Sequence, residues 1–230
     1  MPTPSLPEQT QPHQARVILW LRIARAAAMA MLLVAAGVLA YSYFRPAAPA
    51  PATESAPAEQ HGTPLDPPRQ LSDFALPSQD GTPLHVSDLR GNYVMLFFGY
   101  THCPDVCPTT LSDFVLVKRA MGAASSQVRF VFVSVDGERD TPAVLARFLK
   151  AFDPTFIGLQ GDDTTLGRVS KEYGLYYKKE QVAGTSEPYL VTHSASAYLL
   201  DRQGRMRMVY GFGTPPKVIA ADIGDMIARE

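Results

Sequence analysis

The stretch of residues 93–109 reads YVMLFFGYTHCPDVCPT and contains the strongest indication of the fold class. Its first part, Tyr93 to Tyr100, is a continuous apolar run of strand length, which is typical of a central strand covered on both faces. The run is followed by two cysteines, Cys103 and Cys107, in front of a helical pattern. A buried strand that gives way to a cysteine-bearing turn and a helix therefore organises the rest of the chain.

Helical and strand patterns alternate on the carboxyl side of this stretch. The spacing of apolar residues predicts a helix from Pro108 to Met121 and a second buried strand from Val128 to Asp136. Further helices are expected at residues 141–152, 164–173 and 215–229, and a hairpin at 196–201 and 206–210. This order is the thioredoxin-like arrangement, so we expect an α/β domain with a central mixed sheet flanked by helices, although the pattern alone leaves other topologies open.

The amino-terminal part of the chain has a different character. Residues 26–44 form an apolar run without charge, which at ~1.5 Å per residue is long enough to cross a ~30 Å hydrocarbon core. Several arginines precede this run, whereas only Arg45 follows it closely, so the positive-inside rule places the amino terminus in the cytoplasm. We expect a single-pass anchor in the inner (plasma) membrane with a periplasmic C-terminal domain. A cleaved signal peptide and a buried core helix are the alternatives.

Residues 45–70 are rich in proline, alanine and small polar residues, which bury too little surface to offset the entropy of ordering. We expect an extended tether there. The chain should therefore contain a cytoplasmic segment at 1–25, the anchor at 26–44, the tether at 45–70 and a folded domain at 71–230. Its 230 residues and net charge of -1 suit one globular domain with appendages and do not favour nucleic-acid binding.

The reactive side chains concentrate at Cys103 and Cys107, the only cysteines of the chain. Their place at the start of a helix favours thiolates, because a helix amino terminus carries partial positive charge and free amide groups. Thiolates are soft ligands that suit Cu(I), and a structural zinc site would need four protein ligands. The same pair permits thiol–disulfide exchange, so copper binding and redox chemistry both stay open.

A third ligand has several histidine candidates. His193 precedes the expected strand at 196–201, in a loop that a thioredoxin-like fold would bring beside the cysteines. His102 adjoins Cys103, but continued strand geometry would direct its side chain away from the site, and His85 lies next to a polar loop. Because a lone histidine is more often a surface residue than a ligand, position alone favours His193 without deciding it.

Three segments of the chain resemble signatures of the Sco/SenC family, the copper chaperones of cytochrome c oxidase assembly. They are residues 99–109 with both cysteines, residues 133–142, and His193-Ser194 before a strand. The resemblance extends from about Leu71 to the end of the chain, and an N-terminal anchor also suits the family. It implies that one copper ion is bound by Cys103, Cys107 and His193.

Two positions depart from the family pattern. Thr192 stands where the family commonly has an aspartate before the histidine, and Gly137 stands where proline is usual. A missing carboxylate beside His193 could change how its imidazole is oriented. Asp136, at the end of the second strand, is a candidate for supporting a ligand or docking a partner; alternatively it only ends the strand and shapes the next loop.

The resemblance implies delivery of copper to the CuA-bearing subunit of cytochrome c oxidase, with an upstream copper donor or thiol reductant. A thiol–disulfide oxidoreductase that reduces the acceptor cysteines of the CuA site is the alternative function, and a peroxidase on the same scaffold has less in its favour. Oxidation of Cys103 and Cys107 to a disulfide would abolish metal binding, so the first two functions are compatible.

Overall fold

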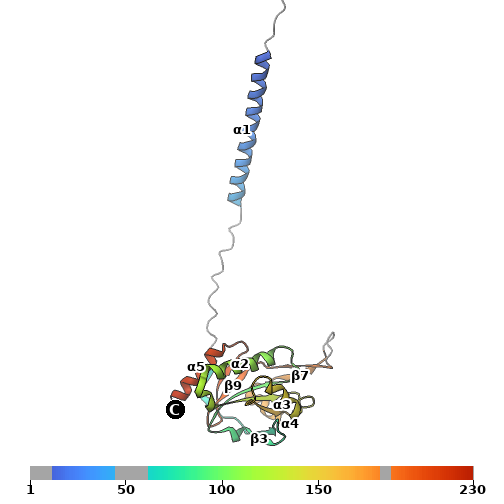
Figure 1. Ribbon diagram of the computed structural model, residues 1–230, viewed down its shortest axis with the longest axis vertical. Helices are drawn as coiled ribbons and strands as arrows, with labels where there is room; N and C mark the ends of the chain where they lie inside the picture. The colour runs from blue at the N-terminus through green and yellow to red at the C-terminus, as the bar shows by residue number, and fades with distance from the viewer. Residues whose placement is uncertain (1–11, 45–61, 182–187, 230) are drawn as a thin grey trace, which may run out of the picture. The chain divides into compact units, whose positions relative to one another are not determined.

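A six-stranded mixed sheet forms the centre of the domain in the computed structural model, which describes residues 12–44, 62–181 and 188–229 (Figure 1). The central strand β4 pairs in parallel with β5 and antiparallel with β9, so it is hydrogen-bonded on both sides. The expected mixed sheet is therefore confirmed. In spatial order the strands are β1 (Thr63–Arg69), β10 (Met206–Tyr210), β9 (Ala197–Leu200), β4 (Tyr93–Gly99), β5 (Val128–Ser134) and β6 (Ile157–Gln160).

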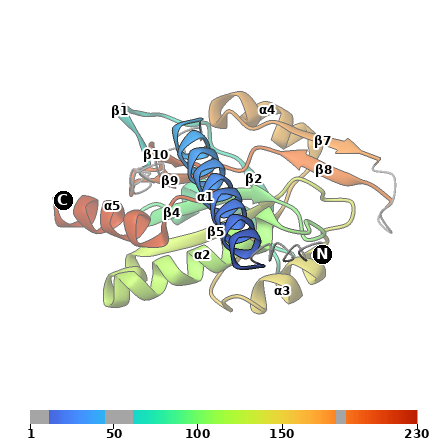
Figure 2. The same ribbon diagram turned by 90° about the horizontal axis from the view of Figure 1, so that it is seen from above.

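Helices cover both faces of this sheet (Figure 2). Phe97 packs against Phe114 of α2, whereas the next residue, Phe98, packs against Tyr173 of α4. Successive residues of a strand point to opposite faces, so the aromatic run of β4 holds helices on both sides. The α-helices are α2 (Val106–Met121), α3 (Pro142–Lys150), α4 (Asp163–Tyr173) and α5 (Pro216–Ala228), with short 3-10 helices η1 (Val86–Leu89) and η2 (Gly122–Gln127).

Two hairpins lie outside the main sheet. The sequence patterns predict neither, because strands this short contain too few residues to show alternation. The second hairpin ends at His193, which therefore closes a strand instead of lying in the loop expected for it. The pairs are β2 (Ala75–Pro77) with β3 (Pro83–His85), and β7 (Tyr177–Glu180) with β8 (Leu190–His193).

The folded domain begins earlier than the sequence indicates. Strand β1 lies within residues 45–70, which the composition assigns to a tether, and pairs antiparallel with β10. Proline cannot donate to a strand ladder but is tolerated on an edge strand, and β1 is an edge of the sheet. The expected boundary at residue 71 is therefore wrong, because the proline-rich composition conceals an edge strand. Residues 45–61 of the expected tether lie outside the described residues.

Helix α1 (Pro12–Phe44) belongs to a separate amino-terminal unit of the chain. Its stretch Trp20–Leu39 has the length and apolar character of a membrane span, and 0% of it is buried within the protein. The expected anchor at 26–44 lies within this helix, whereas residues 1–11 of the expected cytoplasmic segment lie outside the described part. A candidate membrane-spanning helix thus precedes the folded domain.

Gly137 should tolerate no side chain, because a Cβ atom there would overlap the backbone carbonyl oxygen of Gly161. Overpacking typically costs ~1–3 kcal/mol, so we expect Gly137→Ala to lower the free energy of unfolding by about 2 kcal/mol. Urea unfolding followed by circular dichroism measures the change. In the control Gly224→Ala, nothing lies within 4 Å of the added Cβ, and we expect unchanged or greater stability. Equal unfolding midpoints for the two variants would contradict this account.

Candidate metal centre

The cysteines lie where β4 gives way to α2. Because α2 begins at Val106, Cys107 is in its first turn, and Cys103 precedes the helix. The backbone N–H of Cys107 donates to the sulfur of Cys103 across 3.4 Å. The sulfur thus takes the place of a capping oxygen at a helix amino terminus, where unpaired amides and the helix dipole favour negative charge.

Cys107 is completely buried against the end of β4. A Cβ atom built on Gly99, the last residue of that strand, would lie 2.8 Å from the Cys107 sulfur. Glycine at this position therefore lets the start of the helix approach the strand closely enough to bury the second cysteine.

His193 joins the cysteines from the end of β8. Its Nε2 atom lies 3.4 Å from the sulfur of Cys107, and its Nδ1 atom lies 2.9 Å from the carbonyl oxygen of Ser194. A carbonyl oxygen can only accept a hydrogen bond, so Nδ1 carries a proton, and Nε2 is the ring nitrogen that faces the cysteines. The rings of Phe97 and Tyr100 pack edge-on against the imidazole and restrict its orientation.

The candidate ligand atoms of Cys103, Cys107 and His193 all lie within 4.8 Å of one another. Among the described histidine, cysteine, aspartate and glutamate side chains, these three form the group that could hold a metal ion. The fold therefore brings together the three residues that the sequence nominates. Cys103 and His193 are partly exposed, whereas Cys107 is not, so the group opens to solvent on the side of Cys103 and His193.

The two sulfurs differ in ionisation. Hydrogen bonds to Cys103 from the thiol of Cys107, from the side chain of His193 and from the backbone amides of Asp105 and Cys107 lower its pKa from 9.0 to about 4, although burial acts in the opposite direction. The pKa of Cys107 is raised, because its thiol hydrogen-bonds to the Cys103 thiolate and because it is buried. At neutral pH the metal-free group therefore holds one thiolate and one thiol, and a metal bound by both sulfurs would displace the proton of Cys107.

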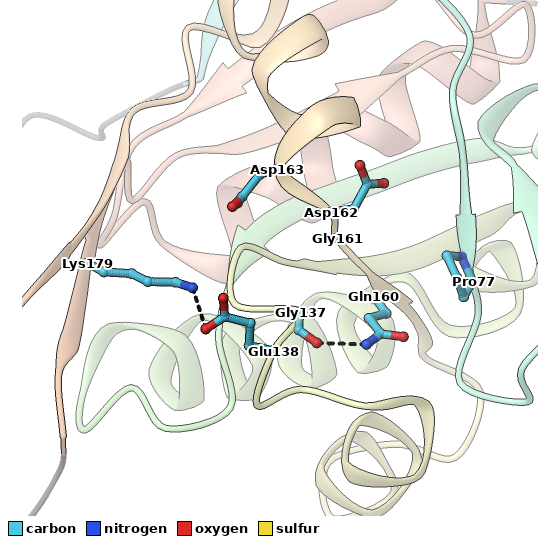
Figure 3. A pocket seen from close by; sticks show the side chains of 8 residues that line it. All are labelled: Pro77, Gly137, Glu138, Gln160, Gly161, Asp162, Asp163 and Lys179. Atoms are coloured by element: carbon cyan, nitrogen blue, oxygen red, sulfur yellow. Dashed lines mark hydrogen bonds and ion pairs between the residues drawn. The ribbon is translucent and has the colours of Figure 1, made fainter.

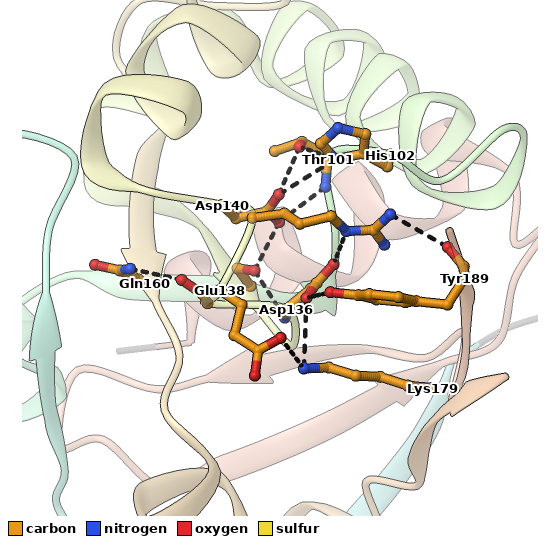
Figure 4. Close-up of polar contacts among 11 residues, drawn as sticks. Thr101, His102, Asp136, Glu138, Asp140, Gln160, Lys179 and Tyr189 are labelled. Atoms are coloured by element: carbon orange, nitrogen blue, oxygen red, sulfur yellow. Dashed lines mark hydrogen bonds and ion pairs between the residues drawn. The ribbon is translucent and has the colours of Figure 1, made fainter. Parts of the chain in front are cut away.

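Asp140, which the sequence does not single out, holds the turn before Cys103 (Figure 4). Its buried carboxylate accepts hydrogen bonds from the Thr101 N–H at 2.9 Å, the Thr101 hydroxyl at 2.6 Å and the Ser134 hydroxyl at 2.7 Å. The Nδ1 atom of His102 lies 3.1 Å from the Thr101 hydroxyl and 3.7 Å from Asp140. His102 is therefore outside the group of Cys103, Cys107 and His193 that could hold a metal ion.

Two other expected candidates also lie outside that group. Asp136 is completely buried, and the described contacts of its carboxylate are with Arg139, Lys179 and Tyr189, not with a cysteine or with His193. His85 instead forms a 3.1 Å contact with an aspartate at residue 73. A direct contact of Asp136 with a ligand is therefore not observed.

Thr192 does not disturb the imidazole next to it. Its hydroxyl donates to Glu180 at 3.0 Å on the exposed side of the hairpin, because neighbouring residues of a strand point in opposite directions. The carbonyl of Ser194 fixes the proton on the imidazole of His193 instead. The aspartate that is common in the family at this position is therefore not needed to fix the tautomer.

Comparison with known proteins establishes the family. The family described as SCO1/SenC matches residues 63–228 of the chain, which cover the sheet, its helices and all three members of the candidate metal-binding group. The chain belongs to the SCO1/SenC family. The match begins at the first residue of β1, in agreement with the observed start of the folded domain.

Individual relatives support the same fold. The mitochondrial SCO2 homolog of Mus musculus is 36% identical over 158 residues, which cover 68% of this chain and 62% of that protein. The copper-bound structure of Bradyrhizobium japonicum ScoI is 40% identical, with a TM-score of 0.60, over 67% of this chain and 97% of that one. Copper-bound yeast Sco1 is 27% identical, with a TM-score of 0.64, over 71% and 91%. The expected thioredoxin-like fold is thus confirmed.

In the metal-free protein we expect Cys103 to remain ionised well below neutral pH. Its thiolate should disappear only as the pH falls through about 4, because its pKa is lowered to that value. The ultraviolet absorbance of the thiolate during an anaerobic acid titration measures this. Cys107→Ala, which removes the main hydrogen-bond donor, should move the midpoint toward the ordinary value. A wild-type midpoint near 9.0 would contradict the assignment of Cys103 as the thiolate.

Proposed function

We propose that the domain binds one copper ion through the sulfurs of Cys103 and Cys107 and the Nε2 atom of His193. The observation that carries this proposal is the approach of the three ligand atoms within 4.8 Å. Two sulfurs and a neutral imidazole are soft enough for Cu(I), and they fall short of the four ligands of a structural zinc site. The copper-bound state of Bradyrhizobium japonicum ScoI, 40% identical to this chain, supports the same choice of metal.

Copper is cargo for this domain and is passed to a second protein. Because Cys103 and His193 are partly exposed, an incoming ligand can reach the ion from their side while Cys107 still holds it from within. An ion with few ligands can accept a new thiolate before an old ligand leaves, so no free ion has to form. In keeping with the family resemblance, the acceptor is the CuA-bearing subunit of cytochrome c oxidase, and an upstream donor or thiol reductant prepares the site.

Helix α1 would keep this exchange at the membrane. The arginine distribution around residues 26–44 favours a cytoplasmic amino terminus and a periplasmic domain. An anchor that holds donor and acceptor on one membrane face raises their effective concentration without any new contact.

An anaerobic Cu(I) titration of the purified protein against a competing chelator tests the site. We expect one tightly bound equivalent in the wild type, none in Cys103→Ser/Cys107→Ser, and at least about tenfold weaker binding in His193→Ala, which corresponds to ~1.4 kcal/mol. His85→Ala should bind like the wild type, because His85 lies outside the metal-binding group. Equal copper affinity in the wild type and in His193→Ala would contradict the three-ligand site.

The ionised Cys103 beside a protonated Cys107 also favours a second function, thiol–disulfide exchange with the acceptor. A thiolate is the attacking species in such exchange, and the neighbouring thiol can resolve the mixed disulfide.

Incubation with a CuA domain prepared in two states, with its cysteines reduced and with its cysteines oxidised to a disulfide, separates the two functions. Copper delivery should transfer one metal per domain to the reduced acceptor and slow strongly in His193→Ala, because the imidazole is then missing from the copper site. A thiol reductase should instead form acceptor thiols from the oxidised acceptor, with its own Cys103 and Cys107 left as a disulfide, without copper and with no dependence on His193. Counting acceptor thiols and bound copper in the same samples measures both reactions. If acceptor thiols form and no copper is transferred, the thiol-reductase function is supported and copper delivery is contradicted.

A further inference from the structure

The β7–β8 hairpin carries His193 but is not part of the main sheet. Within the described residues its two strands pair only with each other. A two-stranded hairpin is only marginally stable in water by itself. Contacts between the hairpin and the rest of the domain therefore help to fix the position of His193 relative to the cysteines.

Tyr189, Val191 and His193 occupy alternate positions and share the inner face of the hairpin. Val191 is buried, and His193 packs onto Tyr100 with 5.9 Å between ring centroids. The Tyr189 hydroxyl donates to Asp136 at 2.7 Å (Figure 4). The inner face is thus attached to the domain at both ends, by Tyr189 at one and by His193 at the other.

Arg139 holds the same tyrosine in two further ways. Its guanidinium carbon lies 3.9 Å from the centroid of the Tyr189 ring, and its Nη1 donates to the Tyr189 carbonyl oxygen at 3.2 Å. Its Nε donates to Asp136 at 2.5 Å, so cation and carboxylate compensate each other where both are largely buried. We call Asp136, Arg139 and Tyr189 the latch.

The loop that supplies two members of the latch is itself held firmly. Figure 3 shows the wall of a cavity of about 410 Å³, where Gln160 donates to the Gly137 carbonyl at 2.7 Å and Lys179 pairs with Glu138 at 2.9 Å. Asp140, in the same loop, holds Thr101 in the turn that precedes Cys103. One loop therefore positions both the cysteine-bearing turn and the histidine-bearing hairpin.

We propose that the latch sets the distance between His193 and the cysteines and so determines copper affinity; this inference rests on the proposed function. Tyr189 and His193 are about 13 Å apart along an extended strand at ~3.3 Å per residue. A tilt of about 5° at the latch would move the imidazole by ~1 Å, enough to loosen a metal site. None of the described contacts of the latch residues is with a ligand atom of the group, so we treat them as positioning residues.

A double-mutant cycle on the detergent-solubilised full-length protein tests the latch by anaerobic Cu(I) titration. We expect Tyr189→Ala to weaken binding by ~10- to 100-fold, as for other residues that orient metal ligands. Tyr189→Phe, which keeps the ring beneath Arg139, should weaken copper binding less than Tyr189→Ala does. In a His193→Ala background, Tyr189→Ala should have no further effect, because the latch acts through His193. Thr192→Ala, one residue from His193 on the exposed face, is the matched control and should bind normally.

Two results would overturn the latch. One is a double variant whose loss of copper affinity equals the product of the losses in Tyr189→Ala and His193→Ala. The other is unchanged copper affinity in both Tyr189 variants. Imidazole nitrogen NMR of the copper-free protein gives a readout that does not depend on the metal. The wild type should show the Nδ1-protonated tautomer of His193, and Tyr189→Ala should show tautomer exchange. If the wild type binds no copper but this difference persists, the proposed function fails and the latch stands. If copper binds but the cycle is additive, only the latch fails.

Discussion

The parallel ladder between β4 and β5 runs in register from Tyr93–Val128 to Gly99–Ser134, and every residue of β4 is buried. Parallel strands end at the same edge of a sheet, so the segments that follow them emerge side by side. The segment after β4 carries Cys103, and the segment after β5 carries the latch aspartate and Asp140. Strand β9 pairs antiparallel with β4 and begins at this edge, so the chain before it brings His193 to the same place.

Negative charge gathers at this edge, and each group is compensated differently. Asp140 accepts hydrogen bonds from neutral donors, and Asp136 pairs with the guanidinium of Arg139. The sulfur of Cys103 accepts a hydrogen bond from a backbone N–H at the amino terminus of α2. Asp140 also contributes to the raised pKa of Cys107, because a second negative charge beside it would be repelled. The site therefore keeps one proton until a cation replaces it. A soft cation is favoured, because the atoms that would bind it are two sulfurs and an imidazole nitrogen.

The sequence predicts the features that depend on local patterns. The apolar run before Tyr100 marks the central strand, and the pair Cys103 and Cys107 marks the start of a helix. Contacts between distant residues leave no such pattern: Asp140 holds Thr101 across 39 residues, and Tyr189 reaches Asp136 across 53. For Asp140 a signal exists, since it lies in the segment that resembles the second family signature. Nothing local distinguishes Tyr189 from other tyrosines of the chain.

The strand order also determines where the first strand of the folded domain lies in the sheet. β1 is antiparallel to β10, and its first residue, Thr63, pairs with Val209. Val209 pairs with Tyr198 of β9, and Tyr198 pairs with Leu96 of β4. Three strand spacings of ~4.8 Å place the start of β1 about 14 Å from the central strand, level with the middle of that strand. From there β1 runs antiparallel to β4 and away from the edge that carries the cysteines.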